Sequence, residues 1–150
     1  MKVIEAIDER IIDLSLDAKN KEEAIMKLTN KLNEAGYVRD IQGFIKDIYE
    51  RETLGATGIG NYIAIPHGKS DSVNRVGISI GRLKEEIEWE TLDGKGVKLI
   101  FLFAVSNDHE YARNHMRLLA EIATKLGNDE VVEKLLDMNC IEQLKEIFSS

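Results

Sequence analysis

The feature that most restricts the fold of this chain is an apolar stretch at residues 97–105, VKLIFLFAV, in which Lys98 is the only charged residue. A strand that is apolar on both faces has to be covered on both faces, which is typical of the central strands of α/β proteins. No apolar run in the sequence approaches the length of a membrane-spanning helix. We therefore expect a central strand with helices on either side and no insertion into a membrane.

Two further strands are predicted on the N-terminal side of this stretch. Residues 76–83 alternate larger apolar residues with Gly and Ser, which is the period of a strand with one buried face. The LDGKG sequence at residues 92–96 has the composition of a turn. Because the span between the two strands is too short for a helical crossover, we expect a mixed sheet. Residues 63–65 are expected to form a short buried strand.

Helices are predicted where apolar residues recur at helical spacing between capping residues. Residues 21–35 follow a capping box and end at Gly36, and a second helix begins at Asp40 and ends near Arg51. Residues 110–126 form a third, with Gly127 as its cap and with an inward face of Tyr111, His115, Leu118, Leu119, Ile122 and Leu126.

Two short helices follow, one led by Asp129 and one capped by Asn139 with Glu142. Together these elements predict the α/β class: a single-domain α/β sandwich over residues 1–150, with a mixed β-sheet flanked by helices on both faces.

Charge and cysteine content exclude several functions. The 150 residues carry a formal net charge of -7, which opposes binding to nucleic acid or to an anionic bilayer. The N-terminus is acidic and lacks the pattern of a signal peptide, so we expect a cytoplasmic protein. Cys140 is the only cysteine, which rules out an internal disulfide and fits a reducing compartment. We expect Cys140 to be a small buried residue rather than an activated thiol.

The residue with the clearest chemical potential is His67. It lies between the only proline, Pro66, and Gly68, so the imidazole is expected to be held rigidly at an accessible strand end. Imidazole is a nucleophile near neutral pH, and a phosphorylated ring nitrogen is a good phosphoryl donor. A turn histidine on the surface is an equally weighted alternative when only the local sequence is considered.

Other residues are candidates for assisting His67. His115 is expected in the first turns of a helix that begins past the carboxyl end of the central strand, where α/β sheets tend to bind ligands, although by itself it would be a core residue. Arg51 could neutralise a phosphoryl group with its guanidinium. Backbone N–H groups and a hydroxyl at Thr57, Gly58 and Ile59 could face an anion. Neither a nucleotide motif nor a set of metal ligands is present, and we expect no cofactor.

These motifs together resemble the enzyme IIA components of the fructose/mannitol type in the bacterial phosphotransferase system. The resemblance spans nearly the whole chain, and it depends on the stretches RETLGATGIGNYIAIPHGKSDSV, DGKGVKLIFLFAV and NHMRLLAEIATKL. It implies that His67 accepts phosphate from the phosphocarrier protein HPr and donates it to a cysteine of an enzyme IIB domain. It also implies that His115 and Arg51 orient His67 and steady the phosphoryl group.

Within the family, PHGKS followed by GRLKEEIEWETLDGKGV looks closest to the fructose-type branch. Tyr62 stands where glycine is common in this motif, and it is expected either to alter access to His67 or to pack beside it. Two alternatives remain open: a regulatory protein of the nitrogen-type branch, whose phosphorylation state controls partner proteins, and a degenerate module that keeps the fold without phosphorylation. The sequence does not identify the sugar.

Overall fold

The sheet is built around strand β6, Val97–Val105, as the apolar stretch predicts. A computed structural model describes residues 2–149, and within helix α4 the side chains of residues 109–112 and 114 are outside the described set. The predicted inward position of Tyr111 therefore lies outside the described residues. Six strands join in one sheet with the order β1-β5-β6-β3-β2, and β4 also pairs with β6. The bounds of the other strands are β1 Ile12–Leu16, β2 Gly58–Gly60, β3 Ile63–Ala64, β4 His67–Lys69 and β5 Gly77–Ile87.

The sheet is mixed, as predicted. Strands β5 and β6 are antiparallel, whereas β1 is parallel to β5, and β3 and β4 are parallel to β6. Strand β5 extends to Ile87, beyond the predicted end at residue 83, because a register irregularity after Arg82 lets the chain continue to Ile87, which pairs with Val97. Strands β1, β2 and β4 were not predicted, because each is short and owes its pairing to β5, β6 or β3 rather than to a long local pattern.

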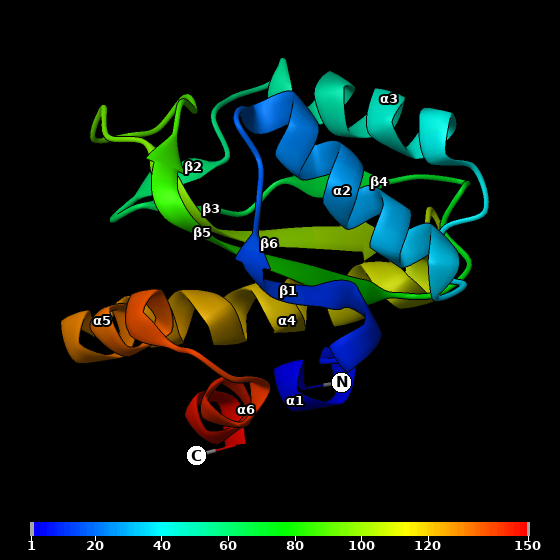
Figure 1. The fold of residues 1–150 in the computed structure, drawn as a ribbon. Helices are drawn as coiled ribbons and strands as arrows, with labels where there is room; N and C mark the ends of the chain where they lie inside the picture. Colours follow the sequence, from blue (N-terminus) through cyan, green and yellow to red (C-terminus); the bar gives the residue numbers. More distant parts are fainter. Residues whose placement is uncertain (1, 150) are drawn as a thin grey trace.

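Helices cover both faces of the sheet (Figure 1), which confirms the predicted sandwich. Helices α2 and α3 lie on one face, and α4, α5, α6 and α1 lie on the other, each layer packing on its own cluster of buried apolar side chains. The bounds are α1 Val3–Ala6, α2 Lys21–Glu34, α3 Ile41–Glu52, α4 His109–Leu126, α5 Asp129–Asp137 and α6 Ile141–Ser149. None of the helices within residues 2–149 is long and apolar enough to cross a membrane.

The predicted caps of the two helices on the first face are present. The side chain of Asn20 accepts a hydrogen bond from the backbone N–H of Glu23, and Asp40 does the same for Gly43. Gly36 closes α2 with a φ of +84°, a conformation that favours glycine. Helix α3 ends at Glu52, so Arg51 lies in its last turn, beside the glycine-rich segment.

The prediction for Cys140 is wrong, because the thiol is exposed. Helix α6 begins at Ile141, so Cys140 precedes its first residue and is not covered by the helix's apolar face. The side of α6 that packs on the core instead carries Leu144 and Phe148.

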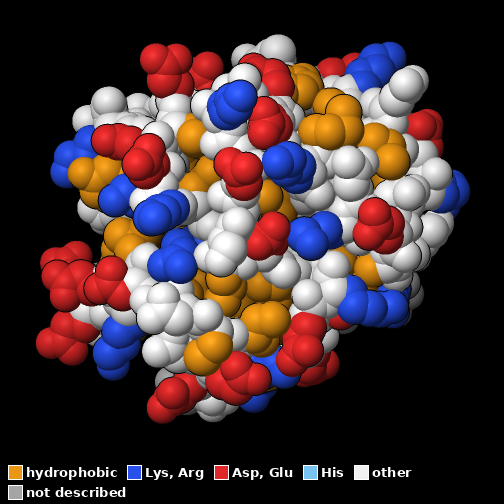
Figure 2. Space-filling view, viewed as in Figure 1, with side chains coloured by type: hydrophobic (Ala, Val, Ile, Leu, Met, Phe, Trp, Pro, Cys, Tyr) orange, Lys and Arg blue, Asp and Glu red, His pale blue; other side chains and the backbone are white. Residues whose placement is uncertain are grey.

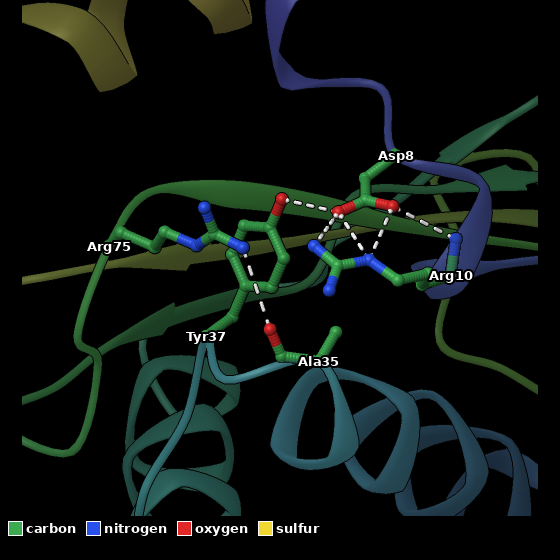
Figure 3. Close-up of polar contacts among 5 residues, drawn as sticks. All are labelled: Asp8, Arg10, Ala35, Tyr37 and Arg75. Atoms are coloured by element: carbon green, nitrogen blue, oxygen red, sulfur yellow. Dashed lines mark hydrogen bonds and ion pairs between the residues drawn. The ribbon is translucent and has the colours of Figure 1, made fainter.

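A polar cluster fastens the segment before β1 to the loop after α2 (Figure 3). The hydroxyl of Tyr37 donates to Asp8 over 2.8 Å, and Arg10 donates to the same carboxylate over 2.7 Å. The hydrogen bond from Arg10 holds the pKa of Asp8 well below its usual range. The guanidinium of Arg75 lies 4.0 Å from the centre of the Tyr37 ring on its face. These contacts orient the chain so that β1 can pair with β5.

Candidate functional site

His67 is the first residue of β4, and its ring lies against the central strand. It pairs with Phe103 of β6, and the two rings stack with centroids 5.6 Å apart and 12° between their planes. The carbonyl of the preceding Pro66 accepts a hydrogen bond from Phe103 N over 3.0 Å. On the opposite face of β4, a Cβ atom at Gly68 would lie 2.2 Å from the ring of Phe44 in α3, so only glycine fits there. His67 is therefore held from both sides.

His115 reaches the same place from α4. Its ring centroid is 5.1 Å from that of His67, at an interplanar angle of 84°, and 5.1 Å from that of Phe103, at 85°. The two histidines thus meet edge to face over one phenylalanine. This juxtaposition agrees with the expectation that a helix starting after β6 brings His115 near the strand that carries His67.

Both imidazoles are set to be neutral near pH 7. Burial, then the charges of His115 and Arg51, lower the pKa of His67 from 6.5 to about 4, while the Ile65 backbone acts in the opposite direction. Burial, followed by the charge of Lys69, also lowers the pKa of His115. The Nδ1 atoms of His67 and His115 are buried and have no hydrogen-bond partner among the described residues. A neutral imidazole with a free lone pair is the form that can attack phosphorus.

Arg51 lies close enough for its charge to act on His67. It is half-buried in the last turn of α3, and its Nη1 donates to the carbonyl of Gly55 over 3.2 Å. A guanidinium carries five N–H donors, so this bond leaves others for an anion. The structure therefore brings together His67, His115 and Arg51, which are widely separated in the sequence.

Thr57, Gly58 and Ile59, whose backbone N–H groups and hydroxyl are predicted to face an anion, lie in and beside a short strand. Gly58 and Ile59 belong to β2, which pairs with β3, and Thr57 is buried. The Thr57 hydroxyl donates its proton to Glu52 Oε2 over 2.7 Å, so it is not free to donate to an anion in this arrangement. Because Thr57 O accepts from Ile65 N over 2.9 Å, the segment nevertheless lies beside the residues that lead into His67.

Tyr62 lies in the two-residue turn between β2 and β3. Asn61 and Tyr62 have φ values of 55° and 67°, which is the geometry of a tight hairpin turn that favours glycine at the second position. The Tyr62 ring faces two ammonium groups, Lys95 at 5.5 Å and Lys98 at 5.1 Å. Its side chain therefore packs with lysines near the start of β6.

Sequence analysis missed several neighbours of the site. The sequence predicts Phe103 only as part of the apolar central strand and gives Lys69 no role, although strand alternation places Lys69 on the same face of β4 as His67. Glu52 occurs only within a quoted motif. Lys21, whose Nζ lies 2.5 Å from Glu52 Oε1, occurs only within a predicted helix. Lys69 could have been identified from its i, i+2 spacing after His67. Lys21 could have been identified as a lysine at the first position of a helix, where the helix dipole disfavours a cation. Within the described residues, no group of three or more His, Cys, Asp or Glu could hold a metal ion.

Comparisons with known proteins point to one family. The sequence pattern described as "Phosphoenolpyruvate-dependent sugar phosphotransferase system, EIIA 2" matches residues 5–150. The chain is 34% identical over 150 residues to the "PTS system fructose-specific EIIABC component" of Bacillus subtilis, a match that covers 99% of this chain and 23% of that protein. The next two curated relatives are also much longer, and the chain spans 20% and 21% of them.

Solved structures share the arrangement of helices and strands. Nitrogen Regulatory Protein IIA-Ntr from Neisseria meningitidis superposes with a TM-score of 0.87 at 25% identity, over 97% of this chain and 98% of the other. The complex of enzyme IIAMTL and phosphorylated enzyme IIBMTL from Escherichia coli contains a chain that superposes with a TM-score of 0.79 at 23% identity, over 95% and 96% of the two chains.

Proposed function

Because the chain belongs to the phosphoenolpyruvate-dependent sugar phosphotransferase system EIIA 2 family, whose members are phosphoryl carriers, we propose that His67 is the residue that carries the phosphoryl group. The observation that supports this most directly is the geometry of the histidine pair. His67 is neutral, stacked on Phe103 and braced by His115, with the charge of Arg51 close by. We propose that residues 1–150 carry out this step as one domain in the cytoplasm.

In the proposed transfer, Nε2 of His67 is the attacking atom, because Nδ1 is enclosed. The lone pair of Nε2 forms a bond to phosphorus while the bond between phosphorus and the donor nitrogen breaks. Arg51 offsets the charge that spreads over the phosphoryl oxygens, and His115 keeps the ring of His67 in the attacking orientation. Thr57, Gly58 and Ile59 would contribute through backbone N–H groups, since the Thr57 hydroxyl is already bonded to Glu52.

The proposed donor is phosphorylated HPr, and the proposed acceptor is a cysteine of an enzyme IIB domain. The acceptor is supported by the complex in which a chain of similar fold is bound to phosphorylated enzyme IIBMTL. We propose the fructose system, which the Bacillus subtilis relative and the PHGKS sequence favour. The regulatory alternative has less support, because the matching family is described by sugar transfer.

The test is phosphorylation with phosphoenolpyruvate, enzyme I and HPr, followed by addition of fructose-type or mannitol-type IIB domains. We expect one acid-labile phosphoryl group on wild type and none on His67→Ala. The matched control is His115→Ala, which should still be phosphorylated but on the order of 100-fold more slowly. Full phosphorylation of His67→Ala would refute the assignment of His67. Stable phosphorylation without transfer to either IIB domain would favour the regulatory alternative.

A further inference from the structure

A buried ion pair includes Glu52, the residue after Arg51, and takes no part in the proposed transfer. Lys21 Nζ, in the first residue of α2, lies 2.5 Å from Glu52 Oε1, in the last residue of α3, and the two side chains are 11% and 9% exposed. Burial works to lower the pKa of Lys21, but the hydrogen bonds to Glu52 and Glu90 outweigh it and raise the pKa. Buried ion pairs are weak evidence for net stability, so this pair is better explained by what it holds in place.

The second carboxylate oxygen of Glu52 holds the end of a turn. Oε2 accepts the hydroxyl proton of Thr57 over 2.7 Å, and the indole N–H of Trp89 donates to the same hydroxyl oxygen over 3.4 Å. The backbone of Thr57 is bonded in turn to Ile65, two residues before His67. Glu52 therefore connects α2 and α3 with the far end of the turn at residues 53–57.

The same turn determines where Arg51 points. The acceptor for Arg51 Nη1 is the carbonyl of Gly55, which lies in the turn between Glu52 and Thr57, and Gly55 N donates to Glu52 O over 3.4 Å. If the bond between Glu52 and Thr57 were lost, the turn would lose its side-chain link to Glu52, and we expect Gly55, whose backbone bond to Glu52 is long at 3.4 Å, to shift and to take Arg51 with it. We propose that Glu52 is a positioning residue for phosphoryl transfer, which closes the turn at residues 53–57 and thereby holds the guanidinium of Arg51 beside His67. This inference rests on the proposed role of His67.

The sign of a titration shift tests the placement of Arg51 without any phosphoryl transfer. The nearby charge of Arg51 lowers the pKa of His67, so displacement of Arg51 raises it. Removal of the negative charge of Glu52 would by itself lower that pKa. We therefore expect an NMR titration of Glu52→Ala to show a higher pKa for His67 than in wild type. In an Arg51→Ala background, Glu52→Ala should cause no rise.

Transfer kinetics test the consequence for the reaction. In single turnovers with saturating phosphorylated HPr, Glu52→Ala should slow phosphorylation of His67 by roughly 10- to 100-fold, the usual effect of a small misplacement. The double variant Arg51→Ala/Glu52→Ala should be no slower than Arg51→Ala, because the two residues act as a unit. The matched control is Glu90→Ala, which also removes a carboxylate paired with Lys21, at 2.8 Å, but keeps the bond between Glu52 and Thr57, and it should leave the rate unchanged.

The outcomes separate this inference from the proposed function. A pKa of His67 that falls or stays unchanged in folded Glu52→Ala overturns the inference, even if wild type accepts phosphate. A wild type that takes no phosphate contradicts the proposed function and leaves the titration to decide the placement of Arg51. If Glu52→Ala does not fold, Thr57→Val removes the bond to Glu52, together with the longer one that Trp89 donates, and keeps the charge of Glu52; it should raise the pKa of His67 in the same direction. An unchanged pKa in Thr57→Val would then overturn the inference.

Discussion

The protonation of His67 links the reactive residue to the stability of the fold. Its folded pKa of about 4 lies below the value near 6.5 of an unfolded histidine. Between these values the unfolded state binds more protons than the folded state, so the free energy of unfolding increases with pH in this window. The contribution is complete above pH 6.5 and is lost as the pH falls towards 4. The burial that keeps His67 neutral, which suits the nucleophilic role proposed for it, thus makes the protein sensitive to acid.

We therefore predict that His67→Gln removes much of the loss of stability between pH 6.5 and pH 4. The difference in this pH dependence between wild type and variant should be at most on the order of 3 kcal/mol. His115, whose pKa is also lowered, is present in both proteins, so the difference between them reports His67 together with its electrostatic coupling to His115. Urea unfolding at a series of pH values provides the measurement. Parallel curves for wild type and His67→Gln would show that the folded pKa of His67 is not depressed.

At the scale of elements, the contact between β4 and α3 determines how closely the helix approaches the sheet. Gly68 leaves room for the ring of Phe44, which is fully buried under α3. The same helix carries Arg51 at its C-terminal end. Any shift of α3 away from β4 therefore moves Arg51 relative to His67. The packing of Phe44 against Gly68 thus affects the position of Arg51 at the proposed site.

Gly68→Ala is predicted to lower the free energy of unfolding by about 1–3 kcal/mol, because the added methyl group overlaps Phe44. It should also slow phosphorylation of the folded protein, since α3 has to move. Gly127→Ala is the control: the nearest atom to its Cβ would be 3.5 Å away and its φ is not positive, so stability should change little. Chemical unfolding and single-turnover kinetics of both variants would settle the point, and equal behaviour would contradict it.

On the scale of the whole molecule, 27 acidic residues outnumber 20 basic ones. Figure 2 shows basic and acidic side chains intermixed on one face, with smaller groups of hydrophobic side chains between them. Two large apolar side chains are conspicuous next to site residues. Leu54, three residues after Arg51, is 81% exposed, and Met116, which follows His115, is 71% exposed. If the protein partner that reaches His67 also covers these two positions, both side chains are removed from water.

Leu54→Ser and Met116→Ser are each predicted to raise the KM for the proposed donor, phosphorylated HPr, by roughly 3- to 10-fold, because part of the transfer free energy of an apolar side chain is lost from the complex. The kcat should be unchanged, since neither side chain reacts. Met26→Ser on α2, where the methionine is 43% exposed, is the control and should leave both constants unchanged. Steady-state transfer from phosphorylated HPr measures both, and an unaltered KM in both test variants would place the docking surface elsewhere.

The local sequence was sufficient for features that depend on neighbouring residues. The continuous apolar stretch at Val97–Val105 correctly predicts β6. The caps at Asn20 and Asp40 predict the starts of α2 and α3, and the helical spacing after His109 predicts α4. Each depends on interactions within one element or its first turn, so a window of the sequence contains the information. The sequence from Pro66 to Gly68 also made His67 a candidate, and its role as the phosphoryl acceptor stays a prediction.

Only the tertiary structure decided which side chains meet. Three contacts join residues that are far apart in the chain. They are the parallel pairing of β1 with β5, the contact between the rings of His67 and His115, and the link from Lys21 through Glu52 to Thr57. The exposure of Cys140 depended on where α6 begins. Such contacts follow from strand register and helix packing, which are set by the summed burial of many side chains on both faces of the sheet. A local sequence pattern does not carry this information.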